Sequence, residues 1–175
     1  MSSVPYEIER KYLIRRPSEA VLRALPGVQA TEITQTYLTM GDDGFGRRVR
    51  RRGSEAAGWE HTYTRKKKVA FGKRIELEDV ISEAEYRALL AEADPALQTV
   101  HKVRWSAPLG ARVLEVDVYA FSETLATAEV ELGDIDEPVT LPETLEVIRD
   151  VTDDPRFTNL ALSRTLAFPP LDTKE

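Results

Sequence analysis

Three charged residues near the N-terminus, Glu7, Glu9 and Lys11, are spaced two apart along the chain. Alternate residues of a β-strand point to the same face, so these side chains would form one row, with roughly 6.6 Å between neighbours at a rise of about 3.3 Å per residue. Two carboxylates followed by an ammonium group suit a hard metal ion held next to an anion. A solvent-facing strand edge produces the same pattern, so the interpretation depends on whether the rest of the chain repeats it.

The same two-residue spacing recurs in six later segments. These charged rows are Arg48/Arg50/Arg52, Lys66/Lys68, Arg74/Glu76/Glu78, Lys102/Arg104, Glu115/Asp117 and Glu129/Glu131. Apolar residues such as Ile8, Val49 and Val116 often occupy the positions between the charges. A sheet with one face in water explains this alternation. It explains less well why acidic pairs fall on some segments and basic pairs on others.

Antiparallel strands that close into a barrel would instead bring all of these rows into one lumen. Clustered carboxylates resist ionising together, and a divalent cation relieves their repulsion. Clustered arginine and lysine side chains need anions, and a planar guanidinium group matches phosphate oxygens bidentately. A polyphosphate that chelates Mg²⁺ or Mn²⁺ would satisfy both clusters, so the rows favour a metal–polyphosphate site.

The composition narrows the class of protein. A chain of 175 residues predicts one domain, and its formal net charge of −6 argues against broad electrostatic binding to nucleic acid or acidic membranes. There is no cysteine, and only His61 and His101 could supply imidazole, so metal ligands would be mainly oxygen atoms. The sequence has neither a signal-like N-terminus nor a run of about 18 apolar residues. We therefore expect a soluble intracellular protein, located in the cytoplasm, with no nucleic acid or membrane partner.

Most of the chain has the period-2 pattern of β-strands. We expect strands at about 5–14, 33–40, 45–52, 60–68, 73–81, 98–106, 111–120 and 126–132. Turn residues separate several of these strands, at 41–44, 53–58 and 108–110. Consecutive strands joined in this way predict a mainly antiparallel sheet.

Helices interrupt the strand pattern. A short helix should begin at Pro17-Ser18 and end before Pro26-Gly27, and Ser82 with Glu85 forms a capping box for a second. A third helix is expected to start at Pro142, and its buried side would be Leu145, Ile148 and Val151. A last short helix is expected at about 158–165.

The order of the motifs provides the strongest signal. The N-terminal segment EIERKYL is followed by QTYL, RVR, TRK, RIELE, KVR, EVD, AEVE and DPRFTN. In this order the sequence resembles the CYTH superfamily, also called triphosphate tunnel metalloenzymes, and within it the bacterial inorganic triphosphatases. The resemblance runs from about residue 5 to 163, which is nearly the whole chain.

The resemblance implies an α+β, mainly antiparallel β fold: an eight-stranded β-barrel tunnel with a charged lumen, open at both ends, and a few flanking helices. It implies a single domain over residues 1–168, and the remaining residues 169–175 are expected to form a flexible tail. The tunnel would bind a small-molecule triphosphate and one or two divalent cations, Mg²⁺ or Mn²⁺. By analogy with the family, we also expect a homodimer.

The resemblance also assigns roles to the charged rows. The expected metal ligands are Glu7, Glu9, Glu129 and Glu131, and the residues that complete the acidic shell or order its water are Glu76, Glu78, Glu115 and Asp117. The expected phosphate ligands are Lys11, Arg48, Arg50, Lys66, Arg74, Lys102 and Arg104, with Arg52 and Lys68 ranked lower because they lie nearer strand ends. The catalytic candidates are Glu9, Lys11 and Lys102. Lys102 is a candidate general base because burial and Arg104 would lower its pKa, although metal-activated water ranks above it.

The leading functional hypothesis is metal-dependent hydrolysis of inorganic triphosphate (tripolyphosphate). Class IV adenylate cyclases and thiamine triphosphatases share the tunnel, and these motifs do not separate them. The sequence has no convincing nucleobase clamp, which favours the hydrolase. A non-catalytic polyphosphate- or nucleotide-binding module could rely on the basic rows alone, so the acidic pairs Glu7/Glu9 and Glu129/Glu131 argue against it. The sequence leaves open whether Tyr37 hydrogen-bonds Lys11 or is a core aromatic residue.

Overall fold

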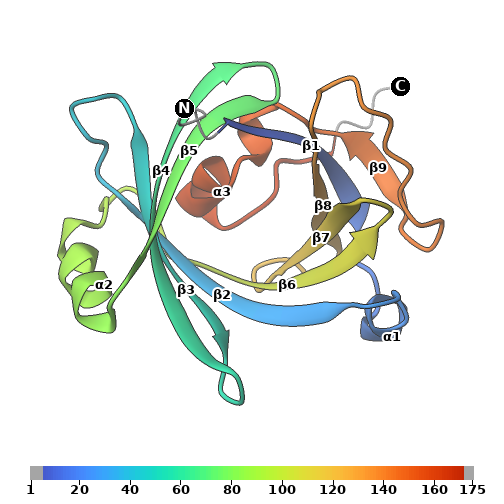
Figure 1. Cartoon of the computed structure of the whole chain (residues 1–175), viewed down its shortest axis with the longest axis horizontal. Helices are drawn as coiled ribbons and strands as arrows, with labels where there is room; N and C mark the ends of the chain where they lie inside the picture. The colour runs from blue at the N-terminus through green and yellow to red at the C-terminus, as the bar shows by residue number, and fades with distance from the viewer. Residues whose placement is uncertain (1–5, 172–175) are drawn as a thin grey trace.

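The computed structural model describes residues 6–171, which form a closed antiparallel β-barrel (Figure 1). Its strands are β1 (Tyr6–Arg15), β2 (Gln29–Leu38), β3 (Gly46–Ser54), β4 (Gly58–Ala70), β5 (Lys73–Ile81), β6 (Val100–Leu109), β7 (Arg112–Tyr119) and β8 (Leu125–Glu131). They follow the spatial order β5-β4-β3-β2-β6-β7-β8-β1, and β1 pairs back onto β5 to close the barrel. The eight predicted strands and the tunnel fold are confirmed, although β2 begins at Gln29 rather than at residue 33.

The predicted helix starting at Pro142 is wrong. Residues 147–150 form a ninth strand, β9 (Val147–Asp150), which pairs with β1. On one edge β1 pairs with β5 only over residues 6–8, so beyond that point the backbone groups of this edge need another partner. β9 supplies that partner opposite Tyr12, Leu13 and Ile14. Leu145 and Val151 are buried as expected, so the sequence pattern correctly indicated burial but not the type of element.

The other helices form where the capping residues predict them. Ser18 caps α1 (Glu19–Arg23), and Ser82 forms a full capping box with Glu85 at the start of α2 (Glu83–Leu89). A 3₁₀ turn, η1 (Leu90–Glu92), continues α2. A second, η2 (Pro155–Phe157), precedes α3 (Asn159–Thr165), whose N-cap is Thr158. None of the helices in residues 6–171 is long and apolar enough to cross a membrane.

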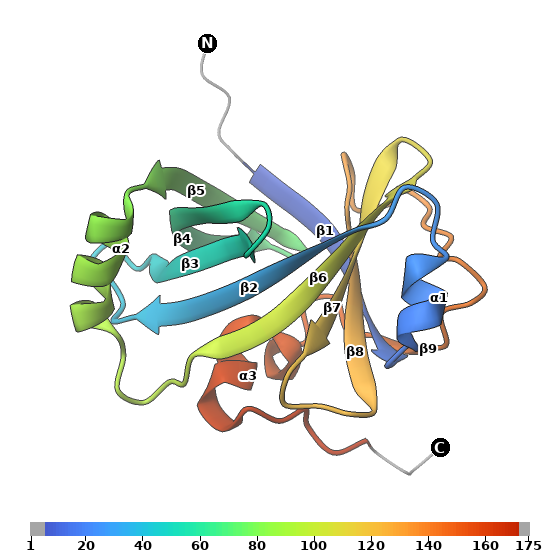
Figure 2. The same ribbon diagram turned by 90° about the horizontal axis from the view of Figure 1, so that it is seen from below.

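The helices cover the outside and the ends of the barrel. α1 and α2 lie at opposite ends of the molecule in both views (Figures 1 and 2). The largest apolar cluster joins Leu22 and Leu25, in and just after α1, to outward-facing residues of β6, β7 and β8 such as Trp105, Val116 and Val130. The core therefore packs against the outer surface of the barrel. The alternate residues of the same strands face inward, which leaves the charged positions for the lumen.

The predicted flexible tail, residues 169–175, falls partly outside the described residues. Residues 169–171 are described and have no helix or strand. Phe168 and Leu171 pack against the apolar cluster of Leu13 and Phe157. The chain is thus anchored to the barrel at least as far as Leu171.

Candidate active site in the barrel lumen

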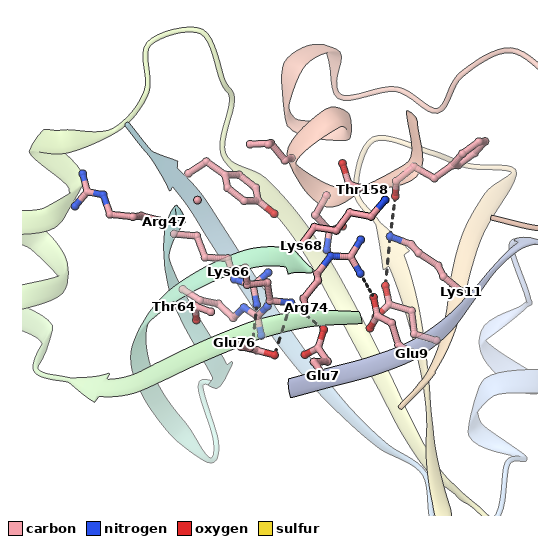
Figure 3. A pocket seen from close by; sticks show the side chains of 18 of the residues that line it. Glu7, Glu9, Lys11, Arg47, Thr64, Lys66, Lys68, Arg74, Glu76 and Thr158 are labelled. Atoms are coloured by element: carbon pink, nitrogen blue, oxygen red, sulfur yellow. Dashed lines mark hydrogen bonds and ion pairs between the residues drawn. The ribbon is translucent and has the colours of Figure 1, made fainter. Parts of the chain in front are cut away.

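A cavity of about 760 Å³ occupies the barrel lumen. Figure 3 shows charged side chains from several strands pointing into it. The predicted site residues that line it are Glu7, Glu9, Lys11, Arg48, Arg50, Lys66, Arg74, Glu76, Glu78, Arg104, Glu115, Glu129 and Glu131, and the lower-ranked Arg52 and Lys68 also line it. Lys102 and Asp117 are not among the described residues at the cavity surface. The strands therefore bring nearly all of the predicted residues together around one space.

The two signs of charge lie on different sides of the lumen. We call the carboxylates of four neighbouring strands, β7, β8, β1 and β5, the acidic wall: Glu115, Glu129, Glu131, Glu7, Glu9, Glu76 and Glu78. The cations of β4, β3 and β6 form the basic wall: Lys66, Lys68, Arg48, Arg50, Arg52 and Arg104. Lys11 on β1 and Arg74 on β5 are cations within the acidic wall. This arrangement exists only because β1 pairs with β5, which joins the acidic strands into a continuous surface.

Two pairs of glutamates in the acidic wall stand directly opposite each other in the strand ladders. Glu9 on β1 faces Glu131 on β8, and Glu115 on β7 faces Glu129 on β8. Like charges in this position destabilise a sheet. Burial, with the charges of Glu129 and Glu7, raises the pKa of Glu9 to about 8. Burial also raises the pKa of Glu115, although Arg104 opposes this shift.

Glu7 and Glu76 form a coupled carboxyl pair beside the basic wall. The Nζ of Lys66 lies 3.2 Å from Glu7 Oε1 and 3.8 Å from Glu76 Oε2. Burial disfavours both carboxylates, but the hydrogen bond from Glu76 and the charge of Lys66 hold the pKa of Glu7 well below its usual value. Burial and the same hydrogen bond raise the pKa of Glu76 to about 7. Within this pair, Glu76 therefore holds a proton more readily than Glu7 does.

The basic wall contains guanidinium groups with unused hydrogen-bonding capacity. Arg48 and Arg50 are 6% and 4% exposed, and the Nε atom of each has no hydrogen-bond partner among the described residues. Burial, then the charges of Arg48 and Arg104, lowers the pKa of Arg50 to about 9. Arg48 Nη2 lies 3.9 Å from Glu76 Oε1, beyond hydrogen-bond distance, so both buried guanidinium groups keep planar donors that match phosphate oxygens.

Lys102 and Asp117 lie behind the surface of the cavity. The Nζ of Lys102 lies 2.7 Å from Asp117 Oδ2, and Arg104 contacts both oxygens of Asp117, through Nε at 2.8 Å and Nη2 at 2.9 Å. The third nitrogen of Arg104 pairs with Glu115 at 2.5 Å. Burial, partly offset by Asp117, lowers the pKa of Lys102 to about 7. The network fixes Arg104, which does reach the lumen.

Lys11 is held by two acceptors. Its Nζ donates a hydrogen bond to the carbonyl of Phe157 at 2.7 Å and lies 3.3 Å from Glu129 Oε1. The hydroxyl of Tyr37 accepts a hydrogen bond from Gln35 at 3.3 Å. Tyr37 lines the cavity, so it is a lumen residue and not a core aromatic.

Comparison with known proteins agrees with this geometry. The model of the CYTH domain matches residues 5–157. The chain belongs to the CYTH family. The resemblance drawn from the motifs is thus confirmed, and the charged barrel is a CYTH tunnel.

Solved structures share the fold. The inorganic triphosphatase NE1496 is 26% identical, with a TM-score of 0.57 and coverage of 94% of this chain and 97% of that chain. The protein PH1819 from Pyrococcus horikoshii OT3 is 18% identical, with a TM-score of 0.57 and coverage of 73% of this chain and 78% of that chain, and it supports the fold alone. A comparison with curated proteins finds no match.

The acidic wall of this CYTH tunnel has the donor chemistry that Mg²⁺ and Mn²⁺ require, because its side chains end in carboxylate oxygens. Within residues 6–171, no three acidic or histidine side chains converge closely enough to form a complete metal site. Mg²⁺ commonly uses one or two carboxylates and completes its shell with water and substrate phosphates. The opposed pairs Glu9/Glu131 and Glu115/Glu129 therefore fit a cation that shares its ligands with a bound phosphate.

Sequence reasoning missed several lumen residues near the C-terminal end of the CYTH match. Asp153, Thr158, Asn159 and Arg164 all line the cavity. The DPRFTN motif marked residues 154–159 as unusual, but no spacing rule relates them to the strands that surround the lumen. Only the folded chain shows that this segment reaches the lumen.

Proposed function

We propose that this CYTH protein hydrolyses inorganic triphosphate in its tunnel and that the reaction depends on a divalent cation. The observation that supports this most strongly is the arrangement of an acidic wall and a basic wall around one cavity. A metal–triphosphate complex presents a cation and an anion side by side, so it complements both walls. The likeness to the inorganic triphosphatase NE1496 over nearly the whole chain supports the same reaction.

The basic wall would bind and orient the phosphates. Arg48 and Arg50 are buried, Arg104 is held by Asp117, and Lys66 lies at the border with the acidic wall. Phosphoryl transfer requires mainly positioning and stabilisation of charge, which these fixed cations supply. The chain's own donors would thus hold the phosphate chain in line with an attacking water.

The acidic wall would hold the cation through Glu7, Glu9, Glu129 and Glu131. A bound divalent cation neutralises phosphate oxygens and lowers the pKa of a coordinated water. Lys11 lines the cavity beside Glu129, where it would contact a phosphate oxygen.

We assign Lys102 and Asp117 to positioning Arg104, because Lys102 is paired with Asp117 and has a side-chain exposure of 0%. A proton acceptor for water would have to reach the lumen.

A second candidate is hydrolysis or cyclisation of an organic triphosphate. Part of the cavity is lined by Tyr37, Leu38, Met40, Leu97 and Leu160, which form an apolar surface beside the charged walls. Such a surface could bind the organic group of ATP or thiamine triphosphate. Inorganic triphosphate would leave it unused.

The deciding experiment is an assay of the purified protein with tripolyphosphate, ATP and thiamine triphosphate, each with Mg²⁺, Mn²⁺ or EDTA. We expect phosphate release from tripolyphosphate with either cation and none with EDTA. Glu9→Gln should abolish the activity, whereas Glu146→Gln, which alters an exposed carboxylate that pairs with Arg15 and does not line the cavity, should leave it unchanged. Cyclic AMP from ATP, or a strong preference for thiamine triphosphate, would favour the second candidate. A cytoplasmic location and a homodimer stay predictions from the sequence.

A further inference from the structure

Asp153 is a buried carboxylate in the segment between β9 and η2. Its backbone has a φ of +64°, a left-handed conformation that is uncommon outside glycine. Its side chain is 6% exposed and borders the cavity. A buried charge in an unusual backbone conformation requires compensating contacts.

The contacts of Asp153 come from the β4–β5 hairpin, about 80 residues earlier in the chain. Its Oδ2 accepts a hydrogen bond from the backbone N–H of Gly72 at 3.0 Å and lies 3.0 Å from Lys68 Nζ. Its Oδ1 lies 3.6 Å from Arg74 Nη2 and has no hydrogen-bond partner among the described residues. The carboxylate thus sits between two lumen cations, Lys68 and Arg74.

Arg74 is shared between two carboxylates. Its Nη2 lies 3.6 Å from Asp153, and its Nη1 lies 3.6 Å from Glu9 on β1. Figure 3 shows the Arg74 side chain directed toward Glu9. Both contacts are longer than a hydrogen bond, so the guanidinium group of Arg74 is not fully paired with either carboxylate. Its N–H donors therefore stay free for a third acceptor.

The segment that carries Asp153 is itself fixed to β1. The hydroxyl of Thr152 accepts a hydrogen bond from the backbone N–H of Lys11 at 2.9 Å, and the carbonyl of Phe157 accepts one from Lys11 Nζ at 2.7 Å. Gly72 also accepts a hydrogen bond from the backbone N–H of Glu9 at 3.2 Å. The segment that carries Asp153 is therefore fixed to β1, and so is the β4–β5 turn that binds its carboxylate.

We propose that Asp153 is a positioning residue for triphosphate binding, which keeps Arg74 and Lys68 directed into the lumen and prevents Arg74 from pairing fully with Glu9. This inference rests on the proposed function. Without the charge of Asp153, Arg74 would move toward Glu9. That movement would remove a phosphate ligand and would also occupy a carboxylate that the cation needs.

The test is Asp153→Asn in the full-length protein. Asparagine can still accept the hydrogen bond from Gly72, so the fold should persist and only the charge is lost. We expect the KM for tripolyphosphate and its calorimetric Kd to rise about tenfold or more, with a thermal midpoint close to that of the wild type. Glu146→Gln is the control, because it also removes a carboxylate charge that pairs with an arginine, Arg15, but Glu146 is 74% exposed and does not line the cavity.

A double-mutant cycle provides the second readout. The cycle combines Asp153→Asn with Arg74→Gln, because the contact between these two residues is what directs Arg74 into the lumen. Positioning of Arg74 by Asp153 predicts that their effects on tripolyphosphate affinity do not add, because Asp153→Asn can no longer displace Arg74 once Arg74 has been replaced. The proposal is overturned if Asp153→Asn binds tripolyphosphate as tightly as the wild type, or if the effects of the cycle add. Failure of the wild-type protein to bind tripolyphosphate would instead contradict the proposed function.

Discussion

Lys102 on β6 and Asp117 on β7 form an ion pair of 2.7 Å from which solvent is excluded, with side-chain exposures of 0% and 1%. Arg104 completes the network by contacting both oxygens of Asp117. Asp117 thus compensates Lys102 and, together with Glu115, also Arg104. In an environment of this kind, the loss of one partner leaves charges that water cannot solvate.

Asp117→Asn should therefore destabilise the protein strongly. We expect the free energy of unfolding in urea to fall by about 3–5 kcal/mol, because Lys102 would lose its buried counter-charge and Arg104 would keep only Glu115. Glu146→Gln is the control, since Glu146 pairs with Arg15 at 3.9 Å and its side chain is 74% exposed. An exposed pair of this kind contributes about 0–1 kcal/mol. Similar losses in the two variants would show that the Lys102–Asp117 pair is not structurally important.

Arg50→Met should weaken tripolyphosphate binding without destabilising the fold. Arg50 is buried, and its Nε has no hydrogen-bond partner among the described residues, so the substitution removes a charge that folding does not compensate. Loss of one charge-assisted hydrogen bond to phosphate should raise KM by about ten- to a hundredfold. Arg52→Met, at a partly buried position nearer the end of the same strand, should have a smaller effect. Equal effects of the two substitutions on KM would contradict a central role for Arg50.

The stability of the metal-free protein should decrease as the pH rises from about 4.5 to about 8, the range between the ordinary and the folded-state pKa of Glu9. In this range the folded state binds more protons than the unfolded state, so the free energy of unfolding falls by up to about 1.4 kcal/mol per pH unit for each such proton. Glu76, whose pKa is raised to about 7, acts in the same direction. The check is a series of urea unfolding curves in EDTA for the wild type and Glu9→Gln. The variant should show a flatter pH dependence, and parallel curves would exclude Glu9 as the source.

Gly72→Ala should destabilise the protein more than Gly110→Ala. Both glycines have positive φ, +63° and +59°. An alanine at either position would have to adopt the left-handed backbone conformation, which costs roughly 1–2 kcal/mol. At Gly72 the added Cβ would also lie 2.6 Å from Ile135 Cδ1 and 3.3 Å from the carbonyl oxygen of Glu9, whereas no atom lies within 4 Å at Gly110. Urea unfolding should therefore show a further loss of about 1–3 kcal/mol for Gly72→Ala. Equal losses would mean that the closure of β1 onto β5 tolerates the extra volume.

The direction of each charged row was predictable from local sequence. Alternation of two residues assigns Glu7, Glu9 and Lys11 to one face of β1 whatever that strand pairs with, because successive side chains of a strand point to opposite sides. The caps of α1 and α2 were predictable for a similar reason, since Ser18 and Ser82 satisfy backbone groups within a few residues. These features depend on geometry that is complete within one short segment.

Other features depended on contacts between distant segments. Lys102 and Arg104 share a face of β6, but only Arg104 reaches the cavity. At the end of the barrel where Lys102 lies, Leu162 of α3 packs against Tyr119. Residues 147–150 form β9 because an edge of β1 lacks a partner there, which no local pattern encodes. Asp153 reaches Lys68 and Arg74 only because the C-terminal segment crosses the barrel closure.

By itself, therefore, the sequence determined the family, the eight barrel strands and which side of each of these strands carries charge. The tertiary structure decided which acids and cations meet, because strand order and closure are set by pairing between segments far apart in the chain. The pairing of β1 with β5 is the decisive contact. It joins four acidic strands into one wall opposite the basic wall, and thereby brings residues from all seven charged rows around one cavity.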